Sequence, residues 1–152
     1  EVTTFTHHQS YPDALTYGLV EAASAELGVA PRQLLHDFGV HWVAYTSRES
    51  YGELMALSGD TLPEFLANLD RLHALAAASM PDMHPPSFSV SEVTECSLRL
   101  RYQSERPGLS PMIEGIVAGL GPRFGLRVTC AQVKSRAAGG DHDEFLVTFS
   151  PA

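Results

Sequence analysis

The fold is decided by the stretch Ser97–Ser104, which reads SLRLRYQS and alternates apolar with polar side chains. Leu98, Leu100 and Tyr102 share one face of an extended chain, and this period of two is typical of a strand that buries one face. Similar patterns over residues 88–90, 127–133 and 144–149 predict three further strands, and a turn containing Ala-Gly-Gly-Asp joins the last two. The second part of the chain therefore predicts an antiparallel sheet.

Upstream of this stretch, apolar residues recur at helical spacing. Helices are predicted over residues 11–28, 31–45, 50–58 and 61–77, and another over residues 109–124. Thr61-Leu62-Pro63-Glu64 matches a capping box, and Gly28 is a natural helix end. A Pro-rich loop over residues 80–86 separates the two kinds of pattern. Helices followed by a sheet with one packed helix predict an α+β fold, in a single domain over residues 1–152.

Composition restricts the classes of function. With 152 residues, 44% hydrophobic and 18% charged, the chain is ordinary globular material, and its formal charge of −8 argues against nucleic-acid or anionic-membrane partners. No apolar run reaches the length of about 18 residues that a membrane span needs, and no signal peptide is visible, so we expect a cytoplasmic protein. Zinc, nucleophile-elbow, dinucleotide and P-loop motifs are absent, and we therefore expect no enzyme activity.

His73 follows Leu62 by eleven residues, which is about three helical turns, so it shares the apolar face of the helix predicted over residues 61–77. Its two ring nitrogens need partners away from bulk water. One interpretation is a core histidine that bonds a backbone carbonyl. The other is a neutral imidazole facing an apolar slot, which is what the proximal side of a heme iron requires.

A second polar element is the run Tyr102-Gln103-Ser104-Glu105-Arg106. If the strand continues through Arg106, a phenol, a hydroxyl and a guanidinium lie on one face and form a cradle for anions such as the two carboxylates of a porphyrin. A solvated polar strand face is the alternative. His84-Pro85-Pro86 presents either a rigid apolar edge or simply a stiff loop.

Together these pieces resemble the heme–nitric oxide/oxygen binding (H-NOX) family, and the bacterial members in particular. Residues 68–73 resemble the family's proximal-histidine helix, residues 85–88 its proline segment, and Tyr102-x-Ser104-x-Arg106 its YxSxR motif, 29 to 33 residues beyond His73. Residues 11–12, 41–46, 52–54 and 140–145 are also similar, so the likeness covers nearly the whole chain. Family members begin with roughly thirty further residues, which form helices over the distal side of the heme. This sequence starts after them, with Glu1 rather than Met, and a domain without them would have a more open pocket.

The resemblance implies a helical distal part, a proximal part with a four-stranded antiparallel sheet, and heme b (iron protoporphyrin IX) between the two. It implies that His73 binds the iron, that Tyr102, Ser104 and Arg106 hold the propionates, and that Pro86 presses on the macrocycle and distorts it. The remaining expected cofactor contacts are Leu72, Trp42 and Met112.

Gas preference follows from the same resemblance. Oxygen-binding members place a tyrosine five residues after the motif arginine, where this chain has Pro111 followed by Met112. Without that donor, bound oxygen loses a hydrogen bond worth about 1.5–3 kcal/mol. We therefore expect a nitric oxide sensor that also binds CO.

Gas binding is expected to weaken the iron–His73 bond, to shift the helix over residues 61–77 and to signal to a partner such as a histidine kinase or a cyclic-di-GMP enzyme. Three alternatives stay open. They are an oxygen binder that uses the indole N–H of Trp42, a non-heme regulatory module for another small ligand, and a small enzyme whose turnover survives the loss of His73.

Overall fold

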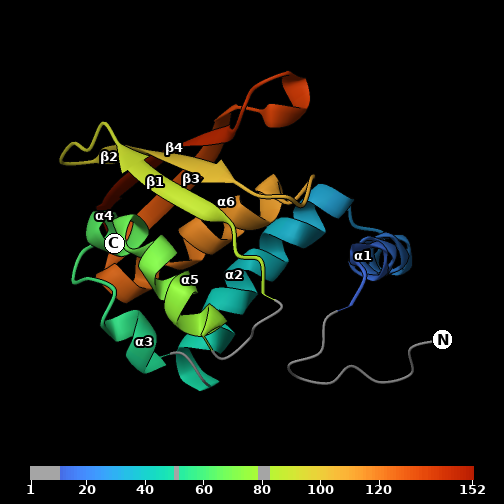
Figure 1. Cartoon of the computed structure of the whole chain (residues 1–152), viewed down its shortest axis with the longest axis horizontal. Helices are drawn as coiled ribbons and strands as arrows, with labels where there is room; N and C mark the ends of the chain where they lie inside the picture. The colour runs from blue at the N-terminus through green and yellow to red at the C-terminus, as the bar shows by residue number, and fades with distance from the viewer. Residues whose placement is uncertain (1–10, 50–51, 79–82) are drawn as a thin grey trace.

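The computed structural model describes residues 11–49, 52–78 and 83–152, and it has an α+β fold (Figure 1). The helices are α1 (Asp13–Leu27), α2 (Pro31–Glu49), α3 (Gly52–Ala56), α4 (Leu62–Ala67), α5 (Leu69–Ala77) and α6 (Ser110–Gly119), with short 3-10 turns η1 (Gly121–Phe124) and η2 (Arg136–Ala138). The strands are β1 (Ser87–Ser91), β2 (Ser97–Gln103), β3 (Leu126–Lys134) and β4 (Asp143–Pro151). Every strand predicted from alternation is confirmed. Residues 50–51 and 79–82, the start of one predicted helix and part of the predicted loop, lie outside the described residues.

The four strands form one antiparallel sheet in the order β1-β2-β4-β3. Tyr102 in β2 pairs with Phe88 in β1 and with Asp143 in β4, so residues from three strands meet at this point of the sheet. The ladder between β3 and β4 is irregular between Gln132 and Lys134. That irregularity lies close to the connection that carries η2.

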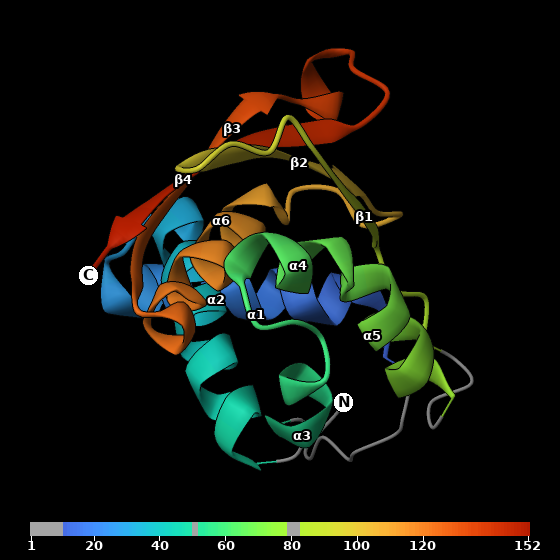
Figure 2. The ribbon, with the colours of Figure 1, turned by 90° about the vertical axis from the view of Figure 1, so that its left-hand side faces the viewer.

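The α-helices lie on one side of the sheet, and on the other side the described residues place only the β3–β4 connection with its short turn η2 (Figure 2). α4, α5 and α6 lie against the covered face, and α2 packs on α6. The most deeply buried side chains come from these layers and are Leu62, Leu66, Leu98, Leu100, Val117, Leu120, Phe145 and Val147. Removing such side chains from water contributes about 1.5–3 kcal/mol each, which makes this layer the core of the fold. Among the described helices, none combines the length and apolarity that crossing a membrane requires.

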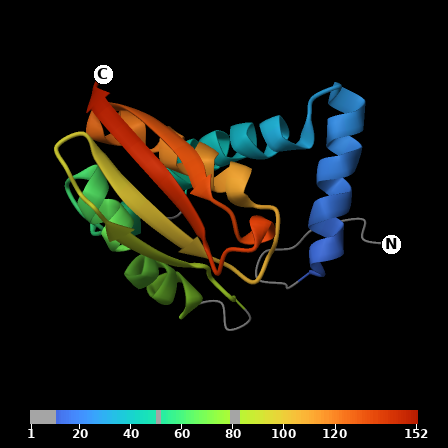
Figure 3. The same cartoon turned by 90° about the horizontal axis from the view of Figure 1, so that it is seen from above.

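α1 stands at the end of the molecule away from most of the sheet and contacts α2 (Figure 3). Gly28 ends this helix in the left-handed conformation, with φ of 64°, as the sequence predicted. Two side chains tie α1 to the segment after β2. The hydroxyl of Tyr17 donates to the Pro107 carbonyl at 2.9 Å, and the carboxylate of Asp13 pairs with Arg106.

The crossing of α2 and α6 depends on glycines. A Cβ on Gly115 would overlap the His36 carbonyl oxygen, and one on Gly39 would overlap the Met112 carbonyl oxygen. The two helix backbones are therefore in direct contact, at a distance that no side chain allows. Inside a helical pattern these glycines carry no local signal, so their role at the crossing cannot be predicted from the sequence.

The helix predicted over residues 61–77 is divided in two, which corrects the expectation of one continuous helix. The capping box is confirmed: the Thr61 hydroxyl accepts from the Glu64 N–H, and the Glu64 carboxylate accepts from the Thr61 N–H. At Asn68 the backbone leaves helical geometry, with φ of −95° and ψ of 4°. The amide of Asn68 donates to the carbonyls of Ser58 and Glu64, and such local bonds compete with the helix ladder.

This break also corrects the expected burial of His73. Leu62, Phe65 and Leu66 in α4 are buried, whereas Leu72 and His73 in α5 are only half-buried. The phase of the apolar face is interrupted at Asn68, so Leu72 and His73 lie at the edge of the core, although Ala76 further along α5 is buried again.

Candidate functional site

His73 lies on α5 and carries an unsatisfied polar atom. Its Nδ1 is buried and has no hydrogen-bond partner among the residues that the structure describes. Burial lowers the pKa of the imidazole below its ordinary value of 6.5, and the nearby carboxylate of Asp70 opposes this shift. The imidazole is therefore neutral at pH 7, which is the form that binds a metal ion.

An aromatic row connects His73 to the sheet. The centroid of its ring lies 5.7 Å from that of Phe88, and the two planes differ by 29°. The ring of Phe88 lies 5.3 Å from that of Tyr102, which lies 6.3 Å from that of Phe145. The row runs from α5 through β1 and β2 to β4. His73 and the first residue of the Tyr102–Arg106 motif are therefore on the same side of the sheet.

Asp70 fixes α5 relative to the start of β1. Its carboxylate accepts a hydrogen bond from the Phe88 N–H at 2.7 Å and another from the Ser87 hydroxyl at 2.9 Å. Pro86, half-buried, immediately precedes these two residues. The proline segment and the helix of His73 are thus held together by one carboxylate. Sequence reasoning missed Asp70 and Phe88; the available signal was that Asp70 stands three residues before His73, on neighbouring turns of one helix.

Tyr102 and Ser104 lie together in the motif. Tyr102 is 3% exposed, and burial is the main reason why the pKa of its phenol is raised above 10.0, while a hydrogen bond with Ser104 acts in the opposite direction. Ser104 follows β2, and its hydroxyl accepts from the N–H of Arg106 at 3.1 Å.

Arg106 does not share their strand face, because the condition for that arrangement, a strand that continues through Arg106, is not met. β2 ends at Gln103 for two reasons. The Ser104 hydroxyl closes a local turn, and Pro107 has no backbone N–H that could donate to a neighbouring strand. The Nε of Arg106 lies 2.9 Å from the Asp13 carboxylate of α1, and its side chain is 55% exposed. The motif therefore presents its hydroxyls on one side and its guanidinium toward α1.

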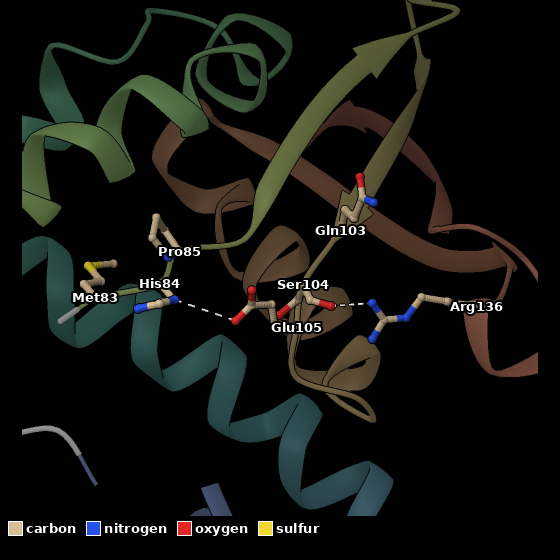
Figure 4. Close-up of a pocket in the computed structure, with 7 residues that line it drawn as sticks. All are labelled: Met83, His84, Pro85, Gln103, Ser104, Glu105 and Arg136. Carbon is tan, nitrogen blue, oxygen red and sulfur yellow. Dashed lines mark hydrogen bonds and ion pairs between the residues drawn. The ribbon is translucent and has the colours of Figure 1, made fainter. Parts of the chain in front are cut away.

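A cavity of about 490 Å³ opens beside the motif (Figure 4). It is lined by Met83, His84, Pro85, Gln103, Ser104, Glu105 and Arg136. Figure 4 shows that these side chains come from the segment before β1, from the end of β2 and from η2. The His84 Nδ1 and the Glu105 carboxylate, 3.7 Å apart, join two of these walls. The cavity thus lies between the proline segment and the Tyr102–Arg106 motif, and Arg136 was not among the residues that the sequence indicated.

The other expected contacts are distributed over α2, α5 and α6. Pro111 is buried at the start of α6, and Met112 is half-buried next to it. Trp42 is 39% exposed on α2, one turn beyond Gly39, whose Cα faces the Met112 backbone. Leu72 lines a small hollow of about 40 Å³ with Leu54, Leu57, Ser58, Asn68, Arg71 and Leu75.

These residues fit a heme in their chemistry. A neutral imidazole with a buried, unpartnered nitrogen suits the iron, and the aromatic and proline side chains beside it suit the macrocycle. Phenol, hydroxyl and guanidinium donors at the end of β2 suit carboxylates. No group of three or more histidine, cysteine or acidic side chains in the described residues forms a site for a bare metal ion.

Comparison with known proteins gives one family. A family model described as haem-NO-binding matches residues 1–132. The unliganded Fe(II) H-NOX protein from K. algicida superposes with a TM-score of 0.83 at 22% identity, over 98% of this chain and 79% of that one. An H-NOX protein from S. oneidensis in the Fe(II)NO state superposes with a TM-score of 0.83 at 16% identity, over 97% of this chain and 81% of that one. These likenesses confirm the α+β fold with its four-stranded antiparallel sheet.

The curated relatives are much longer proteins. The beta-2 subunit of soluble guanylate cyclase from Rattus norvegicus is 33% identical over 91 residues, which are 60% of this chain and 13% of that subunit. Soluble guanylate cyclase 89Da from Drosophila melanogaster is 26% identical over 151 residues, which are 97% of this chain and 23% of the relative. The chain thus spans less than a quarter of the length of either relative.

Proposed function

The chain belongs to the haem-NO-binding family, whose H-NOX domains are heme-based gas sensors, and on this premise we propose that residues 1–152 form one such domain, which binds heme b through His73 and senses nitric oxide. The observation that carries the proposal is the buried Nδ1 of His73, for which the described part of the chain offers no hydrogen-bond partner. Leaving a buried polar atom without a partner destabilises the folded protein by about 1–3 kcal/mol. A bound group that gives this nitrogen a partner removes that cost. H-NOX domains sense and do not catalyse on their own, so we carry over no cyclase activity from the longer relatives.

Each side chain has a distinct task in this proposal. His73 presents a neutral imidazole to the iron, and Phe88 keeps the ring in place by packing against it. The hydroxyls of Tyr102 and Ser104 donate to the carboxylates, and Arg106 adds charge. Pro86 and Leu72 supply apolar contact on the side of α5. A heme held by these residues would supply an iron that can take a diatomic gas.

The choice of gas rests on Pro111. This buried residue has neither a side-chain donor nor a backbone N–H, and Met112 beside it offers no strong donor. Oxygen needs a hydrogen bond that nitric oxide and CO do not need, and its absence weakens oxygen binding by roughly ten- to a hundredfold. The alternative is an oxygen binder in which the indole N–H of Trp42 donates the hydrogen bond. Trp42 lies one helical turn from Gly39, where α2 contacts the backbone of Met112 in α6.

The proposed signal uses the link between α5 and β1. Because Asp70 ties α5 to Phe88, a displacement of His73 also displaces the proline segment and the edge strand of the sheet. This linked unit is the element that gas binding biases between two positions. A partner protein in the cytoplasm would bind the two positions of this unit differently and so receive the signal. A histidine kinase, a cyclic-di-GMP enzyme or a cyclase could be that partner.

The carboxylate-binding role of the motif is tested by heme loss. We expect Arg106→Leu to accelerate heme dissociation roughly tenfold or more, because a charge-assisted contact is lost, and Ser104→Ala to have a smaller effect, since one neutral hydrogen bond contributes about 0.5–1.5 kcal/mol. The rate is measured by transfer of heme to an excess of a heme-scavenging globin. Arg127→Leu, an exposed position on β3, is the control and should match the wild type. Equal rates for Arg106→Leu and wild type would place the carboxylate contacts elsewhere.

A further inference from the structure

Arg136 lines the same cavity as Ser104 of the motif. Its Nη1 donates to the backbone carbonyl oxygen of Ser104 at 2.5 Å, across the gap between η2 and the end of β2 (Figure 4). Ser104 and Arg136 both line the cavity of about 490 Å³. Arg136 lies outside the YxSxR motif and far beyond it in the chain, so no motif spacing points to it.

The β3–β4 connection is built to hold this arginine. The backbone N–H of Arg136 donates to the Asp143 carboxylate at 2.8 Å, and the same oxygen accepts from the side-chain amide of Gln132 at 2.8 Å. The backbone N–H of Gln132 in turn donates to the buried carboxylate of Glu114 at 3.0 Å, and that carboxylate pairs with Arg32 at 2.5 Å. A polar chain thus runs from α2 through α6 and the sheet to η2. A position held from so many sides is pre-organised, which lowers the entropy lost on binding a ligand.

Most of the donors of this guanidinium have no acceptor among the described residues. Arginine has five N–H donors, and within the described ranges the hydrogen bond to Ser104 is the one that the side chain makes. The charge of Arg136 also lowers the pKa of the Tyr102 phenol, although burial and Asp143 together keep that pKa raised, so the guanidinium acts on both hydroxyl residues of the motif. The motif arginine, in contrast, is already paired with Asp13.

We propose that Arg136 is a second carboxylate-binding arginine of the heme site, which acts beside Tyr102 and Ser104 and carries the charge that Arg106 partly gives to Asp13. The inference rests on the proposed function and adds a residue from a different strand connection to it. Glu105 lies on the same cavity but is 87% exposed and faces His84, so solvent screens its competition for the guanidinium.

The test compares two cofactors in two variants. Wild type, Arg136→Gln and Arg101→Gln are loaded with ferric heme, and separately with heme dimethyl ester, which lacks the carboxylates. Dissociation of each cofactor is followed by transfer to the scavenging globin. We expect Arg136→Gln to lose heme roughly ten- to a hundredfold faster than wild type, in keeping with the loss of a charge-assisted hydrogen bond. Arg101, exposed on β2, is the charge-matched control, and its substitution should leave the rate close to that of the wild type.

The dimethyl ester separates direct binding from a structural role. If Arg136 binds a carboxylate, wild type and Arg136→Gln release the ester at the same rate. If Arg136 only shapes the segment at Ser104, the variant releases heme and ester faster by the same factor, and the proposal is wrong. Equal heme release by wild type and Arg136→Gln also overturns it. A wild-type protein that takes up neither cofactor contradicts the proposed function itself, which is a different and recognisable outcome.

Discussion

His73→Ala is expected to give a folded protein that retains no heme after gel filtration, whereas the wild type retains it. The imidazole lies at the edge of the core and is only half-buried, so its removal changes the packing little. It does remove the one side chain on α5 that has a lone pair suited to iron. Heme content is measured from the Soret absorption relative to protein, and the fold from the thermal unfolding curve of the heme-free variant.

Two controls make this result specific. Free imidazole should restore heme binding to His73→Ala, because it would supply the nitrogen ligand that the variant lacks. His41→Ala, which removes an exposed histidine of α2, should retain heme like the wild type. Full retention of heme by His73→Ala without added imidazole would show that another group holds the iron.

Gly115→Ala should destabilise the protein by about 3 kcal/mol, at the upper end of the usual cost of overpacking. The added Cβ would overlap the His36 carbonyl oxygen, and because that atom belongs to the α2 backbone, only separation of the two helices relieves the contact. The free energy of unfolding is measured by urea denaturation of the heme-free protein, with the slope compared between variants.

Gly18→Ala is the matched control for this substitution. Gly18 lies in α1, and a Cβ there meets nothing within 4 Å. The change should raise the free energy of unfolding by about 0.5–1 kcal/mol, since alanine favours the helix over glycine. If both glycine variants are stabilised, α2 and α6 are not in direct backbone contact.

The elements that could be predicted from the sequence are those determined by residues close together in the chain. Alternation over Ser97–Ser104, the capping box at Thr61 and the helix end at Gly28 depend on residues a few positions apart, and each is confirmed. The break at Asn68 was missed, because the Ser58 carbonyl that captures its amide comes from a preceding turn whose position only the fold sets. The same holds for Gly115, which looks like an ordinary helical residue until α2 is placed against it.

Some residues of the candidate site could likewise be predicted from the sequence, and others could not. His73, Tyr102 and Ser104 could be named from a motif, and the structure joins His73 to Tyr102 through Phe88. The direction of Arg106 depends on Asp13, which is distant in sequence, and no pattern within the motif encodes that pair. Arg136 reaches the motif through a strand connection, and for that reason its place in the site could be found only in three dimensions.

One set of absorption spectra decides whether this chain holds a heme through His73 and uses it to sense nitric oxide. The heme-loaded protein is reduced without oxygen and then mixed with nitric oxide or with air-saturated buffer, in the wild type and in Trp42→Phe. We expect a Soret band in the reduced protein, an immediate shift of that band with nitric oxide, and with air only slow oxidation that is the same in both variants. A stable, air-induced shift that disappears in Trp42→Phe would make the protein an oxygen binder, and a wild type without any Soret band would show that the chain holds no heme.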